Sequence, residues 1–310
     1  MAHGLWLTAH AGAGDDRRPA EVGRRARLEL RFAERRGRTV LAAAYAEPPF
    51  RVGRTFQEGD GLHMIMASSA PGVFGGDWLE QVIHVEPGAK VRLTSQSAMQ
   101  VHSSNARGAP PPLDRAAALE DALSSRGPQA LFDDPQARAT IRSRYFVAGG
   151  AALTCLWDPM IPFPASRLDQ RYEIRLEDGG RLIWSDAVMA GREARGERWQ
   201  FASLAHELAV WRGSVLAYLE RFRIEPEARA VSHPWVASDA CYFGTTLVGQ
   251  DGVDAAVAER LHVDLSQSPG VRAAADLVDA GLLLVRLMGS AGVSFHAARR
   301  RAAQGLGPRA

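Results

Sequence analysis

Apolar and polar residues alternate along much of the chain, and a period of two residues is typical of strands that bury one face. Two such stretches, Arg27–Phe32 and Thr39–Ala44, flank the dipeptide Arg36-Gly37, which suits a tight turn. The pattern recurs around Pro87-Gly88, where the apolar residues before and after the turn continue one face. These positions predict pairs of strands joined by short turns.

Two further turn signals extend the pattern. Asp178-Gly179 stands between "RYEIRL" and "RLIW" as a strong hairpin signal, and Arg212-Gly213 divides the segment Glu207–Ile224 in the same way. Repeated hairpins predict a mainly β fold of stacked antiparallel or mixed sheets. The polar stretch Leu93–Ser104, "LTSQSAMQVHSS", also has the periodicity of a strand.

Helices are expected in two places. Asp114 is placed to cap the alanine- and leucine-rich segment that follows it, inside an expected surface insertion over residues 105–142. In the C-terminal third, Asp254 is placed to cap a helix whose buried face holds an apolar residue every four positions. A short strand, "GLLLVRLM", and a basic helix from about Phe295 follow. No shift in composition marks a linker, so we expect a flexible leader over residues 1–26 and a single domain over residues 27–310.

Composition narrows the class of protein. The chain has 310 residues, a net charge of +2 and 46% hydrophobic residues. No apolar run approaches the roughly 20 residues of a membrane span, and the N-terminus lacks the pattern of a secretory signal, so a cytoplasmic location is expected. Nucleic-acid binding is not expected, because neither a basic stripe with interleaved aromatics nor a known module is visible. Two distant cysteines exclude a disulfide framework.

Gly75, Gly76 and Asp77 form the most conspicuous polar turn. A strand follows them and no lysine is near, so a phosphate-binding loop is excluded. Paired glycines permit positive φ at a strand entrance, and Asp77 is placed to hydrogen-bond the turn. The alternative is that this polar group faces a partner or a solvent passage.

A second polar island is "GREARGERW", in which Arg192 and Glu197 suit either a solvated turn or a fixed polar corner closed by a salt bridge. The preceding "WDPMIPFP" carries three prolines, which fit an edge or a corner between sheets.

No catalytic, cofactor-binding or tight metal site is predicted. The sequence has no G-x-S-x-G elbow, and its nine histidines lack the spacing of metal ligands. Convergence of His63, His84 and His102 across strands remains open at this point.

Taken in order, these islands resemble the urease accessory protein family known as UreD or UreH. The resemblance lies in "GGDWLEQVIHVEPGAKVRLTSQSAMQVHSS", "ALTCLWDPMIPFPASRLDQRYEIRLEDGGRLIWSDAVMAGREARGE" and "LERFRIEP", and it covers roughly residues 27–300. It implies a β-helix-like stack of sheets with a few helices. The segment between Asn105 and Arg142 is longer than the family pattern.

The resemblance implies a non-enzymatic maturation factor, or chaperone, of the urease metallocentre. Such a protein binds apo-urease and, through UreF-like and UreG-like partners, supports nickel insertion, with nickel in transit and no tightly bound cofactor. Ions in transit need weak, exchangeable oxygen or imidazole contacts. Gly75, Gly76, Asp77, Arg192 and Glu197 are then candidates for polar corners near an ion passage or docking surface.

Two rival hypotheses remain. A hydrolase or lyase on a β scaffold would use Asp77 or Glu197 with a nearby histidine, and it predicts a concave pocket with two convergent ionisable groups, one of perturbed pKa. A standalone metal sensor would instead retain nickel in stoichiometric amounts.

Overall fold

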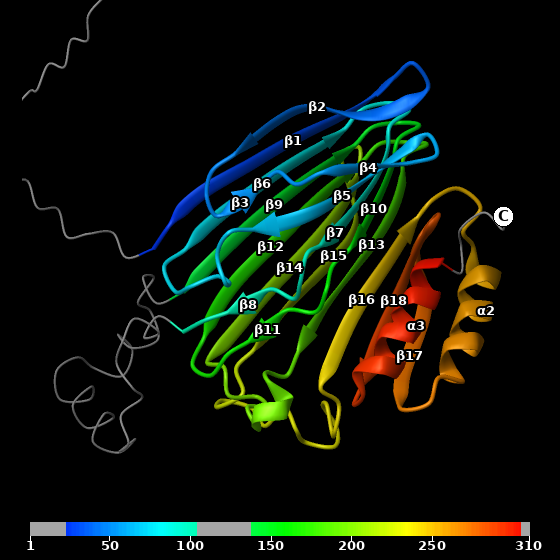
Figure 1. The fold of residues 1–310 in the computed structure, drawn as a ribbon. Coiled ribbons are helices and arrows are strands. Elements are labelled where there is room, and N and C mark those ends of the chain that lie inside the picture. Colours follow the sequence, from blue (N-terminus) through cyan, green and yellow to red (C-terminus); the bar gives the residue numbers. More distant parts are fainter. Residues whose placement is uncertain (1–22, 104–137, 305–310) are drawn as a thin grey trace, which may run out of the picture.

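A computed structural model describes residues 23–103 and 138–304 (Figure 1). The described chain is mainly β, as the sequence predicts, and two large sheets face each other across a hydrophobic core. The first sheet has seven strands in the order β15-β14-β12-β9-β6-β1-β2. Their bounds are β1 Arg25–Arg35, β2 Arg38–Ala46, β6 Trp78–Val85, β9 Ala139–Val147, β12 Arg167–Leu176, β14 Ser203–Arg212 and β15 Val215–Ile224.

The second sheet has nine strands in the order β17-β18-β16-β13-β10-β7-β5-β3, with β4 paired to β5. Their bounds are β3 Phe50–Arg51, β4 Thr55–Glu58, β5 Gly61–Ser68, β7 Lys90–Ser95, β10 Ala152–Leu156, β13 Arg181–Met189, β16 Tyr242–Gly249, β17 Val271–Asp279 and β18 Leu282–Gly289. A third, two-stranded sheet pairs β8 (Gln100–Val101) with β11 (Ile161–Pro162).

The chain winds through these sheets as a coil. It passes from β6 to β7 to β8, then from β9 to β10 to β11, and then from β12 to β13, and each turn of the coil lies parallel to the one before it. This winding gives the β-helix-like architecture that the family resemblance implies. Antiparallel pairs occur at the start and end of the chain, as in β1–β2, β14–β15 and β16–β18.

The core lies between the two large sheets. Its largest fully buried side chains include Trp184, Tyr145 and Phe32, and the rings of Tyr145 and Tyr172 meet Trp184 edge to face at 5.1 and 4.9 Å. Full burial of a large side chain contributes about 1.5–3 kcal/mol, so facing apolar strands supply most of the drive for stacking.

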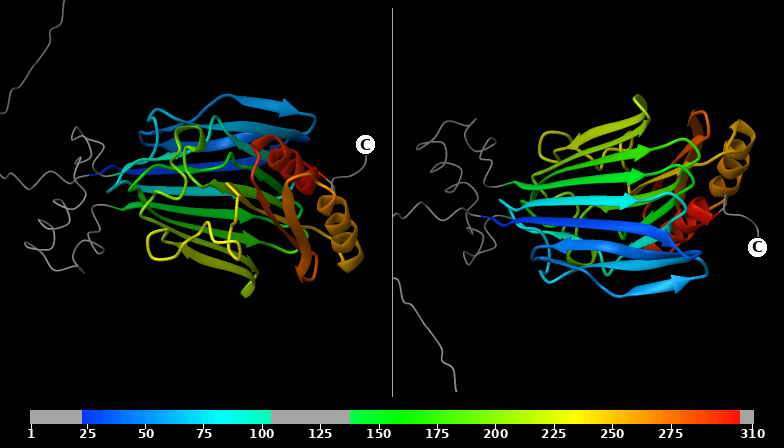
Figure 2. Two further views of the ribbon diagram at one scale, coloured as in Figure 1. Left: turned by 90° about the horizontal axis from the view of Figure 1, so that it is seen from below. Right: turned by 90° about the horizontal axis from the view of Figure 1, so that it is seen from above.

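Two helices lie on one side of the molecule, beside β16–β18 (Figures 1 and 2). Helix α2 (Ala255–Ser266) begins where predicted, because Asp254 Oδ1 accepts the Val257 backbone N–H at 2.8 Å. Helix α3 (Gly292–Gln304) is fixed by the buried Arg299, which donates to the Trp157 carbonyl at 2.8 Å and to the Ser185 hydroxyl. Within the described residues, no helix is long and apolar enough to cross a membrane.

Two of the predicted hairpins are wrong. The turns at Pro87-Gly88 and Asp178-Gly179 are present, with positive φ at both glycines, but each connects strands of different sheets, β6 to β7 and β12 to β13. The apolar faces of the joined strands face each other across the core. Each turn is therefore an arch between the two sheets, and the two strands that it connects do not hydrogen-bond to each other. The hairpin at Arg212-Gly213 and the turn at Arg36-Gly37 are confirmed.

The prediction of one strand over Leu93–Ser104 is also wrong. Strand β7 ends at Ser95, and β8 begins at Gln100, because the coil turns a corner there. Two hydrogen bonds hold this corner. The Gln96 N–H donates to the Met66 carbonyl at 3.0 Å, and the Asp158 N–H donates to the Ser95 hydroxyl at 2.7 Å.

Two predicted boundaries shift. Strand β1 begins at Arg25, inside the expected leader, and β9 begins at Ala139, inside the expected insertion. Residues 1–22 of the leader and residues 105–137 of the insertion, with its expected helix after Asp114, lie outside the described residues.

Candidate functional site

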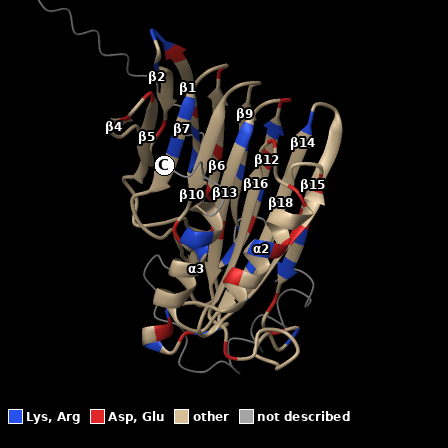
Figure 3. Ribbon diagram, turned by 90° about the vertical axis from the view of Figure 1, so that its right-hand side faces the viewer, with Lys and Arg blue, Asp and Glu red and all other residues tan. Residues whose placement is uncertain are grey.

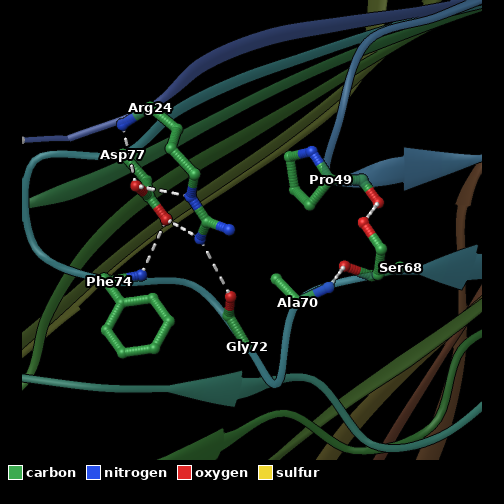
Figure 4. Close-up of polar contacts among 8 residues, drawn as sticks. Arg24, Pro49, Ser68, Ala70, Gly72, Phe74 and Asp77 are labelled. Carbon is green, nitrogen blue, oxygen red and sulfur yellow. Dashed lines mark hydrogen bonds and ion pairs between the residues drawn. The ribbon is translucent and has the colours of Figure 1, made fainter.

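Asp77 is a buried carboxylate that ties the start of β1 to the start of β6 (Figure 4). Its side chain is 2% exposed. Oδ1 accepts the Arg24 backbone N–H at 2.9 Å and Arg24 Nε at 3.2 Å, and Oδ2 accepts the Phe74 N–H at 2.9 Å and Arg24 Nη2. The predicted bond between Asp77 and its own turn is therefore confirmed, but Arg24 is a partner that the sequence does not indicate.

The two glycines before Asp77 behave differently. Gly76 has a φ of +88°, which fits the predicted positive φ at the strand entrance, and Gly75 is a buried residue of the same turn. Gly76 also lies against Gly23. A Cβ added to Gly23 would stand 2.0 Å from the Gly76 carbonyl oxygen. The glycines thus allow the chain before β1 to pass close to the turn.

The second polar island forms the predicted salt bridge. Arg192 Nη2 donates to Glu197 Oε1 at 2.7 Å, its Nε donates to Oε2, and the two side chains are 29% and 18% exposed. Gly191 precedes this pair with a φ of +136°. The prolines before it lie at a corner, where β11 pairs with β8.

The two polar islands meet through a column of rings and guanidinium groups, which we term the corner stack. Phe74 stacks on His102 at 4.5 Å between ring centroids, and His102 meets the edge of Phe163 at 4.5 Å. Arg24 lies over Phe74 at 5.5 Å, and Arg192 lies over Phe163 at 3.9 Å. Asp77 and Glu197 neutralise the two ends of this column.

His102 is the centre of the corner stack. Its Nε2 is buried without a hydrogen-bond partner. Burial, with a further contribution from the nearby Arg192 charge, holds the pKa of His102 below its ordinary value. A neutral ring at neutral pH suits a column that already carries two guanidinium groups.

Gly191→Ala is expected to lower the free energy of unfolding by about 2–3 kcal/mol, because positive φ and a close contact act together. A Cβ at residue 191 would stand 2.0 Å from the Glu197 carbonyl oxygen. Gly196→Ala is the matched control, since Gly196 has a φ of +72° but open space around it, and it is expected to cost about 1 kcal/mol. Urea denaturation measures the stability of both variants. Equal losses would contradict a specific clash between a side chain at residue 191 and the Glu197 carbonyl.

The three histidines considered above do not share one site. His63 contacts Thr94 at 2.9 Å, His84 stacks on Phe146, and His102 belongs to the corner stack. Among the described residues, no group of three or more His, Cys, Asp or Glu side chains is arranged to hold a metal ion. Both cysteines are buried and unbridged.

Two cavities lie between the facing sheets, and the sequence did not indicate them. One has a volume of about 770 Å³ and the other about 210 Å³, and Asp186 and Ala187 line both. The smaller cavity is also lined by Gly72, whose carbonyl accepts Arg24 Nη2 at 3.2 Å. The corner around Asp77 therefore fixes part of the cavity wall.

Ionisable groups from both sheets line the larger cavity. On the nine-stranded sheet, the ionisable Asp186 and Arg286 lie on β13 and β18, and the Thr245 hydroxyl lies between them in register on β16. Opposite them, His206 and Glu220 come from β14 and β15. Arg286 Nη1 donates to the buried Glu220 at 2.7 Å, which compensates this carboxylate.

Asp186 is the carboxylate where the two cavities adjoin. Burial raises its pKa, and the charge of Glu220 adds to this effect, while His206 and Arg299 oppose it. Gln170 Nε2 donates to His206 Nδ1 at 2.7 Å, and His206 Nε2 has no partner. This polar centre presents a carboxylate oxygen and an imidazole nitrogen, and among the described residues they do not belong to a closed metal cage.

The enzyme hypothesis named two carboxylates as candidates and expected a pocket with convergent ionisable groups. Asp77 and Glu197, the carboxylates named for it, are each held in a salt bridge. The expected pocket with convergent ionisable groups is nevertheless present around Asp186 and His206. A signal for Asp186 existed in the sequence, because it follows Leu182 and Trp184 at a spacing of two residues and so lies on the same face of β13.

Comparison with known proteins gives the family. A family model described as UreD urease accessory protein matches residues 24–310. The chain belongs to the UreD family. The expectation from the sequence islands is thereby confirmed.

Named relatives agree with this assignment. Urease accessory protein UreD 1 of Synechococcus sp. (strain JA-3-3Ab) is 35% identical over 209 residues, which cover 67% of each chain. The UreD of Sorangium cellulosum is 31% identical over 250 residues, covering 81% of this chain and 68% of the relative. The UreD of Klebsiella pneumoniae is 29% identical over 273 residues, covering 87% and 85%. These UreD proteins are named as accessory proteins, which supports a role in urease maturation.

Proposed function

We propose that this UreD-family chain is a non-enzymatic maturation factor that binds apo-urease and acts with UreF-like and UreG-like partners in the cytoplasm. In this proposal it supports nickel delivery to the urease metallocentre, and nickel is cargo, not a resident cofactor. The observation that carries the proposal is the family match over residues 24–310, together with the adjoining cavities between the sheets.

The cavity chemistry supports a passage for a divalent cation. Asp186 presents carboxylate oxygen and His206 presents imidazole nitrogen, and such ligands bind nickel without the softness of thiolates. A buried carboxylate lowers the electrostatic cost of a cation inside a low-dielectric interior. Since no cage of three or more such ligands exists among the described residues, a bound ion would be free to exchange.

In this proposal the polar islands serve as fixed corners. Gly75, Gly76 and Asp77 shape the turn that holds Arg24, and Arg24 in turn holds Gly72 at the wall of the smaller cavity. Arg192 and Glu197 close the other end of the corner stack. Their role is to keep the wall in place while the ion makes its contacts deeper in the interior.

Co-purification tests the proposal. The tagged chain, co-expressed with its urease subunits and UreF-like protein, is expected to elute with both in one complex during size-exclusion chromatography. Elution of the chain alone, with both partners folded and present, would count against the proposal. The enzyme alternative is tested on the purified chain, where substrate turnover that Asp186→Asn abolishes would favour it.

A further inference from the structure

A hydrogen-bonded pair of side chains lies where the two cavities adjoin. Gln170 of β12 lines the smaller cavity, His206 of β14 lines the larger one, and the bond between them joins Gln170 Nε2 to His206 Nδ1 at 2.7 Å. The two strands are neighbours in the seven-stranded sheet (Figure 3), and the two residues are in register. From the facing sheet, Asp186 lines both cavities and is close enough to His206 for their charges to interact.

Both side chains of this pair are buried, and each keeps one polar atom without a partner. Gln170 and His206 are 2% and 4% exposed. Neither Gln170 Oε1 nor His206 Nε2 has a hydrogen-bond partner among the described residues. A buried polar atom left unpaired costs about 1–3 kcal/mol, so two apolar side chains of similar size would fill the same space at a lower cost. The pair is therefore better explained by function than by stability.

The two members of the pair differ in their freedom to move. The His206 ring stacks on Phe222 at 4.7 Å with 13° between the ring planes, and it meets Tyr172 at 5.9 Å. These contacts fix the plane of the ring. The Gln170 amide makes one side-chain hydrogen bond within the described part of the chain, the bond to His206. Half a turn of this amide exchanges its NH₂ donor for its oxygen acceptor.

The orientation of the amide decides what His206 offers to a ligand in the larger cavity. A neutral imidazole carries its proton on one nitrogen and a lone pair on the other. When Gln170 donates to Nδ1, as in this structure, Nε2 carries the proton and cannot bind a cation. When the amide oxygen faces the ring, Nδ1 carries the proton and the Nε2 lone pair becomes a ligand. The ring stays neutral, because water takes one proton from Nε2 and gives one to Nδ1.

We propose that Gln170 is a positioning residue that switches His206 between a hydrogen-bond donor and a cation ligand, and so controls the transfer of a divalent cation between the two cavities. This inference rests on the proposed function, in which nickel is cargo. The partner of a ligating histidine sets its tautomer, and losing that partner changes metal affinity by about 10- to 100-fold. A reversible switch of this size lets His206 take up the ion and release it again.

Three substitutions separate the two positions of the switch. Gln170→Glu keeps the shape of the side chain but offers acceptor oxygens, so it should hold a proton on His206 Nδ1. Gln170→Met keeps the size with neither donor nor acceptor, and it should be at least as stable as wild type in urea denaturation, because it removes an unpaired buried oxygen. Gln81→Met is the matched control, because Gln81 also lines the smaller cavity.

Nuclear magnetic resonance of the chain labelled with ¹⁵N-histidine reads the switch directly. The shifts of the ring nitrogens report which one carries the proton, and the loss of one signal in His206→Phe identifies His206. Without nickel, we expect the proton on Nε2 in wild type and in Gln81→Met, and on Nδ1 in Gln170→Glu. A proton on Nδ1 in nickel-free wild type would overturn the inference.

Nickel chloride is then titrated into each variant, and paramagnetic broadening of the His206 signal gives the affinity at this residue. We expect nickel to bind Gln170→Glu about tenfold or more tightly than Gln170→Met, with wild type and Gln81→Met between them. The nickel that Gln170→Glu retains through desalting should fall to the level of His206→Phe when the two substitutions are combined. Urease activation in cells should fall in both Gln170 variants, because one holds the ion and the other does not take it up.

The outcomes separate this inference from the proposed function. Equal nickel affinity of Gln170→Glu and Gln170→Met, or retention of nickel by Gln170→Glu that persists with His206→Phe, would overturn the inference and leave the proposed function standing. Failure of the wild-type chain to co-purify with apo-urease would overturn the proposed function and this inference with it.

Discussion

Asp77→Ala is expected to lower the free energy of unfolding by about 2–4 kcal/mol, because it removes a buried carboxylate that accepts two backbone N–H groups and pairs with Arg24, whose own side chain is 33% exposed. The Arg24 guanidinium, the Arg24 N–H and the Phe74 N–H would all lose their acceptor. Orphaned buried donors cost about 1–3 kcal/mol each. The loss should appear in urea denaturation as a shift of the midpoint, with little change of slope.

A solvent-exposed carboxylate of the same chain provides the control. Asp60 forms an ion pair with Lys90, but its side chain is 57% exposed, so Asp60→Ala should leave the midpoint of urea denaturation close to that of wild type. Asp77→Asn should fall between the two, because the amide keeps one acceptor oxygen. If Asp77→Ala unfolded with the same midpoint as wild type, Asp77 would not be the tie between β1 and β6.

Asp186→Asn is expected to have opposite effects on stability and on function. Urease activation in cells should fall about tenfold or more, because the adjoining cavities lose the carboxylate that would attract a cation. The folded chain should become more stable at neutral pH, because a buried group that resists ionisation is replaced by a neutral one of the same shape. Such a trade-off is common where a site is built for function.

The pH dependence gives a second readout for Asp186. Burial raises its folded pKa above the unfolded value of about 3.9, so wild type loses stability as pH rises from the unfolded value through the folded one. Asp186→Asn removes that loss, and its advantage over wild type should therefore be larger at high pH than at low pH. The exposed Asp251→Asn serves as control. Activation at the wild-type level would refute the role of Asp186.

The turns at Pro87-Gly88 and Asp178-Gly179 show what the sequence predicts and what it does not. It predicts each reversal of direction, because a glycine after a turn-forming residue permits positive φ. It does not distinguish a hairpin from an arch between sheets. The alternation of apolar residues is the same in both, and only the position of distant strands decides which face is covered.

The candidate site was predictable in parts. The local bond within the turn of Asp77 and the pair of Arg192 with Glu197 were both indicated, because each spans only a few residues. The column that joins them was not, since Phe74, His102 and Phe163 meet only after the coil has formed. The interior group around Asp186 was missed because its polar members come from strands that are far apart in the sequence.

The nickel content of urease tests the account most directly. Urease is purified from cells that lack this chain and from cells in which it is restored, and nickel per active site is measured by plasma mass spectrometry together with the amount of urease protein. The account predicts equal amounts of urease protein, with nickel largely absent in the deletion strain and restored by the wild-type chain. Full nickel occupancy without the chain would contradict it.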